Sequence, residues 1–109
     1  MIFDHRTYSI RPGKMPDFLA AYGSQGYPLQ QKYLGTCRGW FVSMDIGPLN
    51  QVVHIWEFAD LNDRAERRAN MMADPAWGVY LASATDFIQS MENKILHTAP
   101  FYDMPPIAD

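Results

Sequence analysis

The chain has 109 residues, a formal net charge of −3 and an apolar fraction of 48%, which suits one domain with a core of its own. The negative charge argues against a nucleic-acid-binding surface, no apolar run approaches the ~20 residues that span a membrane, and a single cysteine excludes an intrachain disulfide. The first residues match neither a secretory nor a transit peptide, so we expect a cytoplasmic protein.

The first part of the chain predicts a strand followed by two helical segments. The β-forming residues predict a strand over residues 1–10. Helical spacing of apolar residues follows over residues 14–22. Gly23 and Gly26 are expected to break this helix, and a second helical piece is predicted over residues 28–33.

The remainder predicts two strands, two helices and a final strand. The two strands span residues 37–46 and 51–58, and the short Gly-Pro-Leu-Asn link between them suits an antiparallel hairpin. Asp60 and the Asp74-Pro75 pair mark two helix starts, and the final strand fits residues 92–99. The apolar residues at helical spacing on these two helices are Leu61, Ala65, Ala69, Met72, Trp77, Tyr80, Leu81 and Ala84.

The order β-α-β-β-α-β predicts an α+β, ferredoxin-like fold, with a four-stranded antiparallel sheet and its helices on one face. We expect residues 1–102 to form this domain and residues 103–109 to form a C-terminal tail that either frays or reaches a partner subunit. The other sheet face would stay open in a monomer. We therefore expect a homodimer in which two sheets cover one another.

Strand alternation divides the side chains between the two faces of the sheet. On the third strand, Val53 and Ile55 share one face, and we predict that this aliphatic face contacts the helices. The side chains expected on the other face, inside a barrel shared by two subunits, are Arg6, Tyr8, His54 and Trp56.

Five motifs resemble the NIPSNAP family, in the right order and over residues 3–101. They are Arg6-Thr7-Tyr8 with Pro12-Gly13-Lys14, the Gly47–Trp56 segment, Asp63-Arg64-Ala65-x-Arg67-Arg68, Asp74-Pro75-Ala76-Trp77 and Glu92-Asn93-x-Ile95-Leu96. The resemblance implies membership of the dimeric α+β barrel superfamily, which agrees with the order of elements. The family has no agreed biochemical activity, so the resemblance implies a fold rather than a function.

The polar and aromatic side chains predict a site for a planar or anionic small molecule. Arg6 would pair with a carboxylate or enolate, His54 would be the catalytic acid and base, and aromatic rings would stack on the ligand. The predicted ligand-binding residues are Arg6, Tyr8, Trp56, Trp40 and Trp77. Because Trp40 and Phe41 are adjacent, one of them must face the helices.

Two functions from different classes follow. The first is a homodimeric small-molecule-binding protein, with a cofactor-independent monooxygenase- or isomerase-like activity on an aromatic or polyketide-like substrate as its enzymatic form, by analogy with similar barrels. The second is a non-catalytic interaction module, in which Asp4 pairs with Arg6 or a neighbour, while Tyr8 and His54 are satisfied polar groups of the core.

Other candidate sites have simpler interpretations. No metal site is expected, because His5 and His54 lie on opposite faces. Related barrels bind haem, so haem stays an alternative cofactor with His54 or His97 as its axial ligand. Cys37 lacks a base partner and is expected to be a small buried residue. A solvated helix surface, with ion pairs from Asp60 to Arg64 and from Asp63 to Arg67, accounts for the basic cluster Arg64, Arg67 and Arg68.

Overall fold

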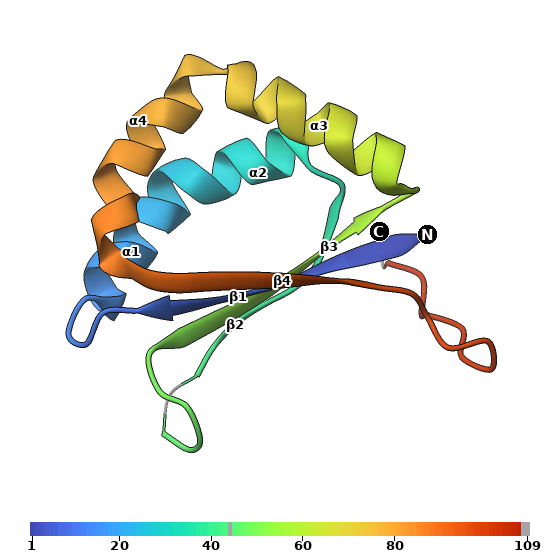
Figure 1. The fold of residues 1–109 in the computed structure, drawn as a ribbon, viewed down its shortest axis with the longest axis horizontal. Helices are drawn as coiled ribbons and strands as arrows, with labels where there is room; N and C mark the ends of the chain where they lie inside the picture. The colour runs from blue at the N-terminus through green and yellow to red at the C-terminus, as the bar shows by residue number, and fades with distance from the viewer. Residues whose placement is uncertain (44, 108–109) are drawn as a thin grey trace.

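A computed structural model describes residues 1–43 and 45–107 of the chain. Its four antiparallel strands form one sheet in the order β2-β3-β1-β4, with all helices on one side (Figure 1). The strands are β1 (Ile2–Ile10), β2 (Thr36–Val42), β3 (Gln51–Phe58) and β4 (Ile88–Leu96). The predicted α+β, ferredoxin-like architecture is confirmed.

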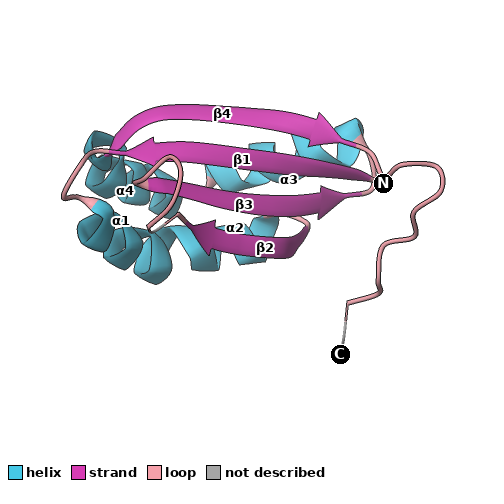
Figure 2. Ribbon diagram, turned by 90° about the horizontal axis from the view of Figure 1, so that it is seen from below, coloured by secondary structure: helices cyan, strands magenta, loops and turns pink. Residues whose placement is uncertain are grey.

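The helices form a single layer, so the opposite face of the sheet carries no helix (Figure 2). The helical elements are α1 (Met15–Ala21), the π-helical turn η1 (Tyr22–Gly26), α2 (Tyr27–Tyr33), α3 (Leu61–Ala73), α4 (Pro75–Ala84) and the 3-10 turn η2 (Thr85–Phe87). The predicted break at Gly23 and Gly26 is wrong, because the π turn joins α1 to α2 without leaving helical backbone.

Gly26 has a packing role rather than a helix-breaking one. A Cβ atom at this position would lie 2.8 Å from the ring of Tyr80 and 2.9 Å from the ring of Tyr22. The missing side chain therefore allows η1 to approach α4 closely. The π turn thus sits where two helices of this layer meet.

The two predicted helix starts are confirmed. Asp60 accepts a hydrogen bond from the backbone nitrogen of Asp63 at 2.7 Å, and Asp74 accepts one from the backbone nitrogen of Ala76 at 2.9 Å. Pro75 occupies the first turn of α4, where its missing N–H costs no intrahelical bond. These caps position α3 and α4 over the sheet.

Strand boundaries of β2 and β4 differ from the prediction, and β4 also ends at Leu96 rather than at residue 99. β2 ends at Val42 rather than at residue 46, because the chain turns through Gly47 and Asn50 with φ angles of 78° and 59°; residue 44 of the predicted strand lies outside the described residues. β4 begins four residues earlier than predicted, since it pairs with β1 along almost its whole length.

The predicted orientation of the sheet faces is wrong. His54 and Trp56 are 0% and 1% exposed and lie on the helix-covered face, whereas Val53 and Ile55 are half-buried on the uncovered face. Trp56 packs in one core cluster with Met71 of α3. Val52 and Phe58, which are 0% and 2% exposed, lie on the same face of β3 as His54 and Trp56, so this face is apolar too.

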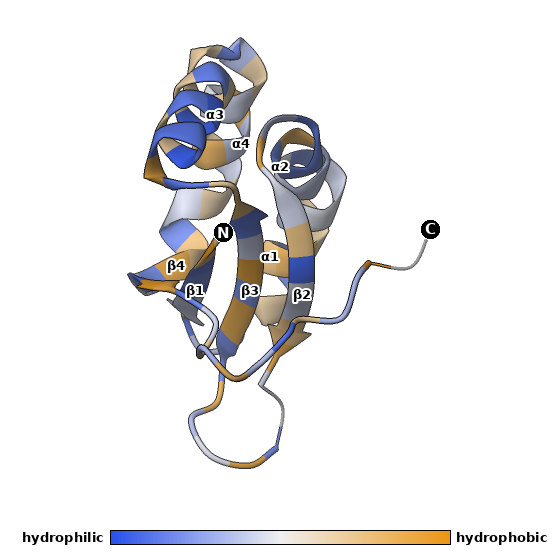
Figure 3. Ribbon diagram, turned by 90° about the vertical axis from the view of Figure 1, so that its right-hand side faces the viewer, coloured by the Kyte–Doolittle hydropathy of each residue, from blue (hydrophilic) through white to orange (hydrophobic). Residues whose placement is uncertain are grey.

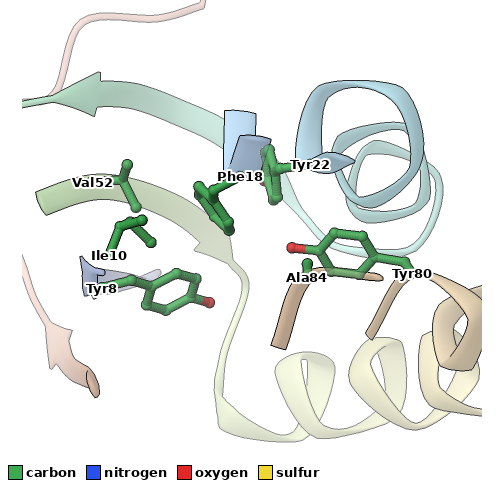
Figure 4. Close-up of a cluster of buried hydrophobic side chains, with 7 residues drawn as sticks. All are labelled: Tyr8, Ile10, Phe18, Tyr22, Val52, Tyr80 and Ala84. Carbon is green, nitrogen blue, oxygen red and sulfur yellow. The ribbon is translucent and has the colours of Figure 1, made fainter. Parts of the chain in front are cut away.

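The core consists of two apolar clusters between the sheet and the helices. One cluster contains Ile2, Leu34, Trp56, Phe58 and Met71. The other, shown in Figure 4, contains Tyr8, Ile10, Phe18, Tyr22, Val52, Tyr80 and Ala84. Three buried polar residues on neighbouring strands, Asp4, Arg6 and His54, share the same sheet face.

The inward face of α3 is more polar than its sequence pattern predicts, and much of this helix is hydrophilic (Figure 3). Leu61 and Met72, expected at the core, are 59% and 58% exposed, while Met71 is fully buried. Arg64 and Arg68 are half-buried instead. The prediction is wrong because the buried carboxylate of Asp4 binds Arg64, which turns this face of α3 toward the sheet.

The C-terminal tail leaves the end of β4 as an extended segment (Figure 2). Phe101, just before the tail, is 91% exposed. Arg38 of β2 donates a hydrogen bond from Nη2 to the carbonyl oxygen of Pro105 at 2.9 Å. Contact with a partner subunit stays a prediction for this segment.

Candidate functional site

A pocket of about 470 Å³ lies between the helix layer and one side of the sheet. This volume falls within the ~300–1,000 Å³ that is usual for small-molecule sites. β1 contributes Arg6 and Tyr8 to its lining, α3 contributes Arg68 and Met72, and α4 contributes Trp77, Tyr80 and Leu81. Ile88–Met91 of β4 completes the wall, with Gln30 and Thr85 beside it.

Aromatic and aliphatic side chains form most of this wall. The rings of Trp77 and Tyr80 lie 5.0 Å apart at 39°. Tyr8 of β1 and Tyr80 of α4 point toward one another from the two layers (Figure 4). Met72 and Met91 are more than half exposed, so the pocket opens to solvent beside α3 and β4. Such walls suit a ligand with a flat apolar body.

Arg6 is the charged group at the floor of the pocket. Its Nε donates to the hydroxyl oxygen of Tyr8 at 2.9 Å, and its Nη1 donates to Oδ2 of Asp4 at 3.1 Å. Burial opposes the charged form of Arg6, but Tyr8 and Asp4 outweigh this effect and raise its pKa. Arg6 therefore stays charged, and within the described residues its Nη2 has no hydrogen-bond partner.

Asp4 accepts hydrogen bonds from each of the polar side chains below the pocket. Besides Arg6, it accepts hydrogen bonds from Nε of Arg64 at 3.0 Å and from Nδ2 of Asn93 at 3.1 Å. Burial alone would raise the pKa of Asp4, yet Arg6, Asn93 and Arg64 lower it. The predicted pairing of Asp4 with Arg6 is confirmed, and the predicted pairing of Arg64 with Asp60 is wrong.

Arg68 is the charged residue of the pocket lining that the sequence interpretation assigned to a solvated surface. It lines the pocket, whereas Arg67 forms the predicted surface ion pair with Asp63 at 2.8 Å. Among the described residues, Arg68 has no salt bridge or side-chain hydrogen bond. Burial, and then the positive charges of Arg6 and Arg64, lower its pKa. Its position four residues after Arg64 was the available signal, because both lie on one helix face.

His54 does not line the pocket. Its Nδ1 accepts a hydrogen bond from Nε1 of Trp56 at 2.8 Å, and its ring stacks on Trp40 with centroids 5.1 Å apart. Burial, and then the charge of Arg6, lower the pKa of His54 to about 3. The imidazole is therefore neutral, and its position gives the predicted acid–base role no support.

Of the predicted tryptophans, Trp56 lies in the core, and Trp40 is half-buried and packs against it. Trp56 is 1% exposed, and Trp40 donates from Nε1 to the hydroxyl of Tyr22 at 2.8 Å. Trp40 thus faces the helices, and Phe41 lies on the uncovered face with 57% of its surface exposed. The residues that form the pocket and were predicted as ligand-binding are Arg6, Tyr8 and Trp77.

The chemistry available at the pocket is positive charge and hydrogen-bond donation. Arginine and tyrosine are the titratable residue types in the part of its lining that the structure describes. Cys37 is half-buried elsewhere, and burial raises the pKa of its thiol. In the described ranges, His, Cys, Asp and Glu side chains form no cluster of three that could hold a metal.

Within residues 1–43 and 45–107, none of the helices has both the length and the apolar character needed to cross a membrane.

Solved structures from two bacteria are similar to this chain over nearly its full length. A NIPSNAP family protein of unknown function from Agrobacterium tumefaciens is 44% identical, with 94% of this chain and 91% of that chain covered and a TM-score of 0.88. A NIPSNAP-like domain protein from Burkholderia xenovorans is 39% identical, with 99% of this chain and 94% of that chain covered and a TM-score of 0.87. The fold alone is shared with an antibiotic biosynthesis monooxygenase, which is 16% identical. That comparison covers 92% of this chain and 100% of the other chain, with a TM-score of 0.64.

Curated relatives are longer than this chain. The NipSnap homolog of Dictyostelium discoideum is 30% identical over 95 residues, which are 87% of this chain and 41% of that protein. The human NipSnap homolog 2 is 28% identical over 87% of this chain and 32% of its own length. The chain thus spans less than half of these relatives. Residues 3–102 match the NIPSNAP family model, and the chain belongs to the NIPSNAP family.

Proposed function

We propose that this chain is a homodimeric small-molecule-binding protein whose ligand occupies the pocket beneath α4. The observation that carries this proposal is the pocket itself: about 470 Å³, with aromatic walls and the charged Arg6 at its floor. A completely filled core would have favoured the alternative of an interaction module. The pocket favours a ligand.

The wall chemistry supports binding more than catalysis. Trp77 and Tyr80 offer flat apolar surfaces, and Arg6 offers a fixed positive charge. A cofactor-independent monooxygenase or isomerase needs a group that accepts a proton from its substrate. No carboxylate or imidazole belongs to the described lining, so we assign recognition of the ligand, rather than proton transfer, to these side chains.

The uncovered sheet face supports the homodimer. Phe41 is 57% exposed there, beside the half-buried Val53 and Ile55. An exposed apolar patch on a sheet is stabilised when a second subunit covers it. In this arrangement the ligand pocket and the dimer interface lie on opposite faces of the same sheet.

Blocking the pocket tests the ligand-binding role. Two acid–amide pairs serve as flat probes for calorimetry: 2-naphthoate with 2-naphthamide, and indole-3-acetate with indole-3-acetamide. We expect saturable binding of at least one probe. Leu81→Trp, which places an indole in the lining of the pocket, should weaken binding by about tenfold or more.

The matched control is Val79→Trp, which adds the same ring to an exposed position of α4 that does not line this pocket. This variant should bind the probe like the wild-type protein. Absence of binding by all four probes, or wild-type affinity in Leu81→Trp, contradicts the proposal.

A further inference from the structure

The polar groups below and beside the pocket have an excess of positive charge. Arg6, Arg64 and Arg68 contribute three guanidinium groups, and Asp4 is the carboxylate that contacts two of them, at 3.1 and 3.0 Å. Asn93 donates a hydrogen bond to the other carboxylate oxygen of Asp4, Oδ1. Asp4 thus already has two arginine partners, and Arg68 has no salt bridge among the described residues.

Arg68 is therefore held in an unfavourable position. Partial burial and the like charges of Arg6 and Arg64 lower its pKa, which means that the surroundings destabilise its charged form. Its neighbour Arg67 avoids this cost by pairing with Asp63 at the surface. An anion in the pocket would offset the repulsion, because both Arg6 and Arg68 line it.

Besides the arginines, the hydroxyl groups of Tyr8 and Tyr80 can donate hydrogen bonds to a ligand. The hydroxyl oxygen of Tyr8 accepts from Arg6, so its own proton is free to be donated. Tyr80 is 3% exposed, and no hydrogen-bond partner for its hydroxyl lies among the described residues. Burial raises the pKa of Tyr80, so this hydroxyl keeps its proton. The two oxygens of a carboxylate can accept several such bonds.

We infer that the ligand is an amphipathic organic acid whose carboxylate lies between Arg68 and Arg6 and whose flat apolar body contacts Trp77 and Tyr80. This inference rests on the proposed function and adds the charge of the ligand to it. A carboxylate matches the guanidinium of Arg68, which lines the pocket and has no counter-charge among the described residues. The planar guanidinium of Arg68 can bind both carboxylate oxygens at once.

Comparing each acid with its own amide tests the charge separately from the shape. We expect 2-naphthoate to bind the wild-type protein about tenfold or more tightly than 2-naphthamide in calorimetry at neutral pH. Arg68→Met keeps an unbranched, flexible side chain of similar helix propensity but removes the guanidinium charge. This variant should bind the two probes with nearly equal affinity.

Arg67→Met is the matched control, since Arg67 is the next residue of α3 and does not line this pocket. It should keep the wild-type preference for the acid. Equal affinity of acid and amide for the wild-type protein overturns the charge inference and leaves the proposed function standing. An acid preference that persists in Arg68→Met removes Arg68 from the assignment, and failure of every probe to bind overturns the proposed function itself.

Discussion

His54 shows how one residue can be well placed in the fold and still be a poor candidate for catalysis. It is fully buried among Tyr8, Trp40 and Trp56. Within the described chain, its Nε2 has no hydrogen-bond partner. A buried imidazole without an acidic partner is more stable neutral than protonated.

This burial makes the stability of the fold dependent on pH. Because the pKa of His54 is about 3 in the folded chain and 6.5 normally, the unfolded chain binds the proton first as the pH falls. The stability contributed by neutral His54 is full above pH 6.5 and is lost as the pH falls toward 3. We expect a loss of ~2 kcal/mol between pH 7 and pH 5 from this residue.

Urea denaturation of the wild type and of His54→Gln at the two pH values measures this contribution. The variant should lose much less stability on acidification than the wild type, whatever its stability at pH 7. His97→Gln, at an exposed position, serves as the control. Its free energy of unfolding should fall between pH 7 and pH 5 by as much as that of the wild type. An identical pH dependence in wild type and His54→Gln would contradict the burial argument.

At the scale of elements, the connection between α2 and β2 depends on a close backbone approach. A Cβ atom on Gly35 would lie 1.7 Å from the carbonyl oxygen of Glu57 in β3. Since that neighbour is backbone, it cannot move without disturbing the pairing of β2 with β3. We expect Gly35→Ala to lower the free energy of unfolding by about 3 kcal/mol, at the upper end of overpacking costs.

Gly78→Ala provides the opposite case, because this glycine of α4 has open space at its Cβ position. Alanine there should stabilise the protein by up to ~1 kcal/mol through helix propensity. Thermal unfolding followed by circular dichroism compares both variants with the wild type. If Gly35→Ala is as stable as Gly78→Ala, the close approach has no energetic importance.

The order and type of the elements could be predicted from the sequence because their signals are local. The caps at Asp60 and Asp74 and the alternation along β1 depend only on neighbouring residues. Which face of β3 meets the helices could not be predicted in this way. Both faces carry apolar residues, and the choice depends on Met71 and Leu34, which are distant in sequence.

The candidate site was predictable only in part, for the same reason. Arg6, Tyr8 and Trp77, which were predicted as ligand-binding, line the pocket. Arg6 and Tyr8 do so from the helix-covered face rather than from the predicted open face. Arg68 was assigned to a solvated surface, because its sequence neighbours form ion pairs. Its real environment depends on the burial of Asp4, which no local pattern reveals.

At the scale of the whole molecule, the two faces of the sheet differ in the role that we propose for them. The helix-covered face holds the pocket, and the uncovered face is the proposed dimer interface. We expect the wild-type protein to have about twice the 12.5 kDa mass of one chain in solution. Phe41→Glu, which places a charge on the uncovered face, should raise the dimer dissociation constant by about tenfold or more.

Size-exclusion chromatography with light scattering over a dilution series gives this dissociation constant. Leu61→Glu is the control, because Leu61 is similarly exposed but lies on α3, on the other side of the sheet. It should dimerise like the wild type. A wild-type protein that is monomeric throughout, or equal effects of the two substitutions, would exclude this face as the interface.

A crystal structure of the protein with 2-naphthoate tests most directly whether a ligand binds between α4 and the sheet. We expect electron density for the naphthalene ring beside Trp77 and Tyr80, with the carboxylate against Arg68. Density on the uncovered face beside Phe41, with the pocket beneath α4 empty, would contradict this expectation.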